Sequence, residues 1–225
     1  MVLVICDTVP SEYFESFEAD ESSGKKIRGY VNNFKKIKDI YKRSSERSRR
    51  ELILEHMNAE LSKEHNCFKC EGFCCTFLHN SMQVTILEAL DVYYYLDQEN
   101  RINEKLIQDL ETCIKSYRLD KEISVGNGRV LRRTYTCPFF NNGPKGCSID
   151  PHFKPYGCLA FNPLEKNVKE EGHCTSNQDV LIDQDKQNIN DHLLNTELKN
   201  ELNLNWDKLS LPLALLNLIK LFQSP

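Results

Sequence analysis

Four cysteines lie within the nine residues CFKCEGFCC at positions 67–75, and two of them, Cys74 and Cys75, are adjacent. A strand does not direct four side chains at this spacing to one side, and Gly72 within the segment allows a tight turn, so the segment is not ordinary core. A second group follows with spacing C-x9-C-x10-C-x15-C. The two groups hold eight of the ten cysteines: Cys67, Cys70, Cys74, Cys75, Cys137, Cys147, Cys158 and Cys174. These eight are the candidate metal ligands.

The redox environment decides between disulfides and a metal. The start of the chain, MVLVICDTVP, has no basic region, and its apolar run is broken at Asp7, so we expect no export signal and a cytoplasmic location. Thiols stay reduced in that compartment, which favours metal over disulfides. The sequence also lacks a run of about 18 apolar residues, so we expect no membrane span.

Spacing alone does not name the metal, because four thiolates satisfy zinc or an iron–sulfur cluster equally well. The first group differs from the ferredoxin run, and no suitably spaced histidine pair completes a zinc-finger pattern. We prefer iron–sulfur slightly, because eight thiolates could serve one or two clusters and adjacent cysteines suit a multi-iron cluster. Zinc is the alternative, and the cysteines that share an ion remain open. The nearby histidines are interpreted as polar loop residues, with His173 the best alternative ligand: His65, His79, His152 and His173.

Charge and periodicity divide the 225 residues into four parts. Residues 1–24 form an acidic arm. Residues 25–65 form a basic amphipathic helical segment, since eleven Lys or Arg lie between positions 25 and 50 and apolar residues recur at helical spacing. Residues 66–176 form a cysteine-cluster metal-binding domain, with an irregular segment over 137–174. Residues 177–225 are C-terminal helices that pack on the core.

Local signals place further elements between the cysteine groups. Thr85 followed by Glu88 predicts the start of a helix over ILEALDVYYYL. A second helix is expected over 102–117, with Cys113 as a small buried hydrophobe. A small β-hairpin is expected around Gly126-Asn127-Gly128. The expected fold class is mostly α, with an irregular cysteine-rich metal-binding lobe and a small β-hairpin.

Three segments together resemble the YkgJ-type cysteine-cluster family, which is described as a zinc- or iron-chelating domain. They are CFKCEGFCC, MQVTILEALDVYYYL and CPFFNNGPKGCSIDPHFKPYGCLAFNP, in this order within residues 67–174. The resemblance implies the eight metal ligands named above, with Cys174 as the trailing cysteine. The chain departs from the family pattern at Asp150, Lys154 and Leu159, which stand where the family has a tyrosine and two arginines. The cysteine region of flagellin lysine-N-methylases is more distantly similar.

The leading hypothesis is a cytoplasmic protein that holds iron, as an iron–sulfur cluster, or zinc through clustered thiolates. One alternative is an enzyme similar to a protein lysine N-methyltransferase that uses S-adenosylmethionine. Another is an interaction module with a structural zinc site, whose basic segment 25–50 binds a protein partner through Lys35, Lys36 and Lys38. Nucleic acid is not expected as a partner, since no reader fold or aromatic platform accompanies the basic run.

Overall fold

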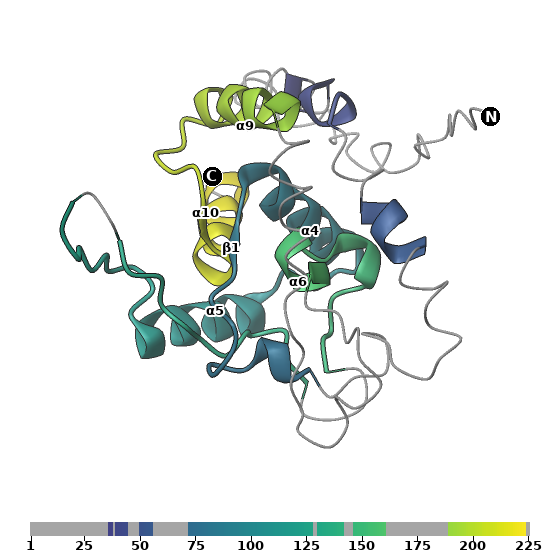
Figure 1. Cartoon of the computed structure of the whole chain (residues 1–225). Helices are drawn as coiled ribbons and strands as arrows, with labels where there is room; N and C mark the ends of the chain where they lie inside the picture. Colours follow the sequence, from purple (N-terminus) through teal and green to yellow (C-terminus); the bar gives the residue numbers. More distant parts are fainter. Residues whose placement is uncertain are drawn as a thin grey trace. The chain divides into compact units, whose positions relative to one another are not determined.

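The computed structural model describes residues 36, 37, 39–44, 50–55, 72–127, 130–141, 146–160 and 189–223. The chain forms two compact units, Met1–Arg43 and Ser44–Pro225. The described residues are mostly helical, as Figure 1 shows, and they include one small antiparallel sheet of two strands. This confirms the helical fold class. No helix among these residues is long and apolar enough to cross a membrane.

In the first unit, residues 36, 37 and 39–42 are helical. Ile37 and Ile40 are buried, whereas Lys36 and Asp39 are exposed, which is the amphipathic pattern expected for this segment. Lys35 and Lys38 lie outside the described residues, as does the acidic arm.

The core of the second unit is built on α4 (Ile86–Gln98). Its start is the predicted one: the Thr85 hydroxyl accepts a hydrogen bond from the Glu88 amide, and the Glu88 carboxylate accepts one from the Thr85 amide. This capping box satisfies two amides that the helix itself leaves without acceptors. Ten of the thirteen residues of α4 are buried, so neighbouring elements cover more than one of its faces.

Three further helices complete this core. The predicted second helix is α5 (Glu104–Tyr117), which the Asn103 side chain caps by accepting from the Leu106 amide. The C-terminal helices are α9 (Ile189–Glu201) and α10 (Leu211–Gln223). The apolar helix α10 packs on both α4 and α5, and α9 packs on α4 (Figure 1). Their buried leucines include Leu198 and Leu215.

The sheet lies where the sequence did not predict one. Strand β1 (Gln83–Val84) pairs with β2 (Leu209–Ser210), with Gln83 opposite Ser210 and Val84 opposite Leu209. β1 leads into α4 and β2 leads directly into α10. The sheet therefore joins the starts of the two most buried helices.

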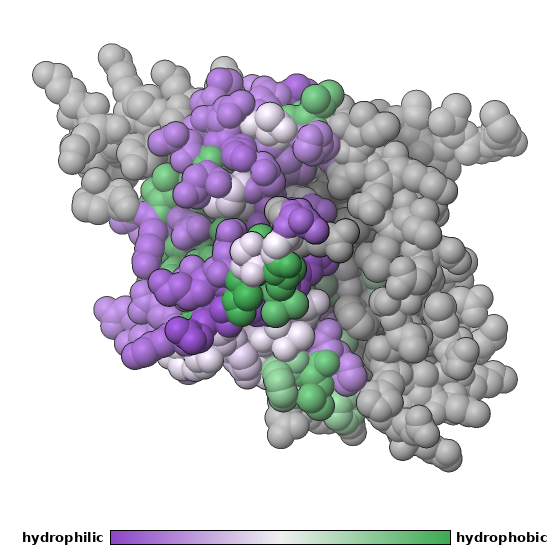
Figure 2. Space-filling model, turned by 60° about the vertical axis from the view of Figure 1, so that its left-hand side comes forward, coloured by the Kyte–Doolittle hydropathy of each residue, from purple (hydrophilic) through white to green (hydrophobic). Residues whose placement is uncertain are grey.

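At the predicted hairpin the described residues, 121–127 and 130–135, form one antiparallel bridge, between Ser124 and Val130. The Leu131 amide also donates to the Ile123 carbonyl at 2.9 Å. The large apolar side chains here are exposed: Ile123, Val125, Val130 and Leu131. Figure 2 shows green hydrophobic patches among the mostly polar residues that are coloured on this face of the molecule. A hairpin that buries neither face has little to extend its ladder, which explains the short pairing.

The segment 137–174, predicted as irregular, is irregular over 137–141 and 146–150 and then forms two short helices. These are η3 (Pro151–Phe153) and α6 (Tyr156–Ala160). Helix α6 begins after Pro155, whose carbonyl accepts from the amides of Cys158 and Leu159. The prediction of a loop was therefore wrong at Cys158, which lies on a helical turn. Residues 161–188 lie outside the described part.

Candidate metal centre

Gly72 allows the first cysteine group to turn and to approach the second. Its φ is +74°, in the left-handed region, and the 3₁₀ turn η2 (Phe73–Cys75) follows it. The Cys75 amide donates to the Gly72 carbonyl at 2.8 Å and closes this turn. A Cβ at position 72 would lie only 2.6 Å from the backbone oxygen of Gly146. Only glycine lets these two backbones meet here, beside Cys147.

A backbone hydrogen bond places Cys137 beside the same turn. The Cys137 amide donates to the Cys75 carbonyl at 2.8 Å. The chain then doubles back, because Phe140 and Cys147 form an antiparallel bridge and the Ser148 amide donates to the Phe139 carbonyl at 2.8 Å. This reversal returns Cys147 to the neighbourhood of Cys137.

Arg101, just after α4, holds the segment that carries Cys147. Its guanidinium donates to the Ser148 carbonyl at 2.7 Å and to the Ser148 hydroxyl at 2.8 Å. The same guanidinium lies over the rings of Tyr95 and Phe139, at 5.7 and 5.9 Å from their centroids. The guanidinium also donates to the Tyr95 hydroxyl at 3.5 Å. These contacts from one side chain fix the position of residues 147 and 148 relative to α4.

Cys158 is positioned by α6, and α6 is in turn held by Glu88. The second carboxylate oxygen of Glu88 accepts a hydrogen bond from the Tyr156 amide at 2.9 Å. On the other side, a Cβ at Gly157 would lie 2.5 Å from the terminal carbon of Met82, so α6 packs directly on that side chain. Glu88 therefore caps α4 and anchors the helical turn that carries Cys158.

Five cysteines converge on two small cavities that share most of their walls. Cys74, Cys75, Cys137 and Cys158 line both cavities, and Cys147 lines the second. Leu211 also lines both cavities. Asn80, Met82 and Tyr135 line the first, and Lys154 is among the further residues that line the second. Each cavity has a volume of about 20 Å³, which is room for about one water-sized particle.

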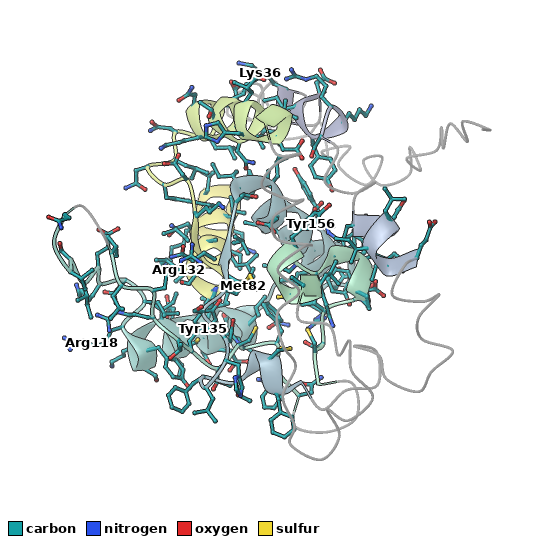
Figure 3. All side chains as sticks on the ribbon, viewed as in Figure 1. Lys36, Met82, Arg118, Arg132, Tyr135 and Tyr156 are labelled. Atoms are coloured by element: carbon teal, nitrogen blue, oxygen red, sulfur yellow. The ribbon has the colours of Figure 1, made fainter. Side chains whose placement is uncertain are left out.

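Tyr135 forms a firm wall of the first cavity. Its hydroxyl donates to the Met82 carbonyl at 2.8 Å and accepts from the Leu211 amide at 3.3 Å, and its side chain is fully buried. Figure 3 shows Met82 and Tyr135 close together, in the part of the view where several sulfur atoms are drawn. The start of α10 is thereby tied to the cysteine-lined region.

The electrostatics of this region favour neutral thiols when no cation is present. Hydrogen bonds that the Cys75 thiol makes with Cys147 and Cys74, followed by burial, raise the pKa of this thiol. Burial is the largest influence on Cys137 and Cys158 and raises the pKa of each, and nearby thiols add to it. Several buried thiols facing one space cannot all ionise unless a positive charge joins them.

The structure thus brings together five of the eight predicted ligands, while Cys67, Cys70 and Cys174 lie outside the described residues. Among the described side chains, no three His, Cys, Asp or Glu are placed around one point in a way that would already hold a metal ion. No disulfide joins any of the six described cysteines. The five described thiols therefore lie close together around the cavities, but they do not form a complete metal coordination shell.

The remaining candidates are also placed. Cys113 is buried and donates to the Thr136 carbonyl at 3.4 Å, as expected for a small core residue. The His152 ring is 60% exposed and bonds to Asp150, and neither cavity includes it or His79. His65 and His173 lie outside the described residues.

Sequence reasoning missed Met82, Tyr135 and Lys154 as parts of the site. These three residues reach the cavities only because segments far apart in the chain pack together. The only local signal was that Met82 and Lys154 fall within the segments that resemble the cysteine-cluster family.

Comparisons with known proteins add no relative: no family model matches the chain, and neither a curated protein nor a solved structure matches it.

Proposed function

We propose that the chain binds a metal, zinc or iron as an iron–sulfur cluster, through clustered cysteine thiolates. The observation that supports this most directly is the convergence of five cysteines, from the 72–75 turn, the 137–147 reversal and α6, on two shared cavities. In this proposal the irregular segment around these cysteines is the metal-binding lobe of the fold.

The donor set fits a thiophilic metal. Thiolates are the preferred ligands of zinc and of iron–sulfur clusters, whereas magnesium and calcium prefer oxygen. The raised pKa values of Cys75, Cys137 and Cys158 mean that a bound cation would drive the release of their protons. Metal binding would then be coupled to pH and to folding.

The two cavities are small, about 20 Å³ each, which is room for about one water-sized particle or ion. The adjacent Cys74 and Cys75 suit a multi-iron cluster, so zinc and an iron–sulfur cluster are both part of the proposal.

The surrounding residues would serve as supports for the ligands. Glu88 holds the start of α6 by accepting a hydrogen bond from the Tyr156 amide. Arg101 holds the segment next to Cys147 by donating hydrogen bonds to Ser148. Such outer contacts orient metal ligands and tune the affinity of the site.

The test is metal binding by cysteine variants with a matched control. Cys137→Ala removes a buried thiol that lines both cavities, and Cys113→Ala removes a buried thiol that lines neither. Reduced, metal-free full-length chain is titrated with cobalt(II), whose thiolate charge-transfer bands report ligation by sulfur. We expect wild type and Cys113→Ala to give the bands and Cys137→Ala to lose or weaken them. Equal spectra for all three, or no bands at all, would contradict the proposal.

A further inference from the structure

Lys154 is a buried lysine beside the cysteine cluster. It lies between η3 and α6, is only 6% exposed, and lines the second cavity together with Cys147 and Cys158. Lysine is almost never buried in this way unless negative charge accompanies it, because moving an ammonium out of water is costly.

Most of the residues that share this cavity with Lys154 are cysteines. Five of them line the cavity together with Lys154: Cys74, Cys75, Cys137, Cys147 and Cys158. A positive charge beside clustered thiols favours their ionised form. The backbone maintains this proximity, since the Lys154 amide donates to the Pro151 carbonyl and α6 begins two residues later.

We propose that the Lys154 ammonium is the charge partner of the thiolate centre and offsets part of its negative charge. This inference rests on the proposed metal-binding function and assigns Lys154 as a positioning residue, not a ligand. A divalent ion held by four thiolates carries a net charge of minus two. In a buried site that charge is poorly solvated, so one fixed positive charge beside it stabilises the metal-loaded form.

Two substitutions separate the effect of the Lys154 charge from the effect of its packing. Lys154→Met keeps a long apolar stem and removes the charge, and Lys154→Arg keeps a charge. The control is Lys105→Met, on α5, where the lysine side chain is 83% exposed and pairs with Asp109 in the same helix. An exposed charge of this kind should not affect the centre.

The experiment measures the zinc dissociation constant of each full-length variant by competition with a chromogenic chelator, in reduced protein. We expect zinc to bind Lys154→Met on the order of tenfold more weakly than wild type, and Lys105→Met to match wild type. Cobalt(II) spectra should be the same for wild type and Lys154→Met, because the ligands are unchanged. Lys154→Arg should retain more affinity than Lys154→Met.

A second measurement covers the case in which the substitution weakens the fold itself. Urea unfolding of each variant with and without zinc separates the two roles. A charge partner of the metal centre gives a larger loss in the zinc-loaded form than in the metal-free form, whereas a purely structural lysine lowers both equally. Equal losses, or wild-type zinc affinity in Lys154→Met, would overturn the inference while leaving metal binding intact. A wild-type chain that binds no zinc or cobalt would instead overturn the proposed function, and this inference with it.

Discussion

Replacement of Glu88 with alanine should weaken the helical core and the attachment of Cys158 at the same time. The Glu88 side chain is 3% exposed, and its two carboxylate oxygens accept from the Thr85 amide at 2.8 Å and the Tyr156 amide at 2.9 Å. Alanine would leave both amides buried without this acceptor. Each buried donor left unsatisfied costs about 1–3 kcal/mol, so we expect a loss of about 3 kcal/mol in the free energy of unfolding.

Urea unfolding of the reduced, metal-free chain measures this loss, and two variants calibrate it. Glu88→Gln keeps one oxygen acceptor and should give an intermediate loss, because its amide nitrogen cannot accept. Glu104→Ala removes a glutamate from the first turn of α5, where it is exposed, and should cost about 0.5 kcal/mol or less. A loss below about 1 kcal/mol in Glu88→Ala would refute the reasoning, since the two hydrogen bonds could not then matter to the fold.

Three other perturbations test separate features. Gly72→Ala should lower the free energy of unfolding in urea by about 2 kcal/mol or more. The alanine Cβ would collide with the Gly146 backbone, and φ at position 72 is positive. Unchanged stability would show that the two backbones do not meet. Asp91→Ala should lower the free energy of unfolding by about 3–5 kcal/mol in the same measurement, because the buried guanidinium of Arg50 then loses the Asp91 carboxylate. A loss under about 1 kcal/mol would contradict a buried ion pair between these two residues. Burial raises the pKa of Cys113 from 9.0 to about 11, so the folded state retains a proton that the unfolded chain loses. Stability from this thiol is complete below pH 9.0 and is lost as the pH rises to about 11. Cys113→Ala should lack this loss of stability between pH 9.0 and about pH 11, and identical pH profiles for the variant and wild type would refute it.

The parts of the fold that were predictable from sequence depend on neighbouring residues. Thr85 and Glu88 mark the start of α4 because a capping box needs only a four-residue span. Gly72 marks a turn because its missing side chain permits positive φ. The eight candidate ligands could be proposed from cysteine grouping alone, and the structure gathers the five that it describes.

The parts that were not predictable depend on contacts between distant segments. The pairing of Val84 with Leu209 joins residues far apart in the chain, and no local pattern specifies it. The second role of Glu88, at the start of α6, appears only when Tyr156 is placed beside it. Lys154 has the sequence of a solvated charge, and only the packing of η3 and α6 shows that it is buried.

The most direct test of the central claim is the metal content of the full-length chain purified without oxygen. Elemental analysis, acid-labile sulfide and the visible spectrum are measured on the same sample. Metal binding by the clustered thiolates predicts near-stoichiometric zinc without colour, or iron with matching sulfide and a broad visible absorption. A chain that folds and contains neither metal, and that binds none when zinc or iron and sulfide are supplied, would contradict the claim.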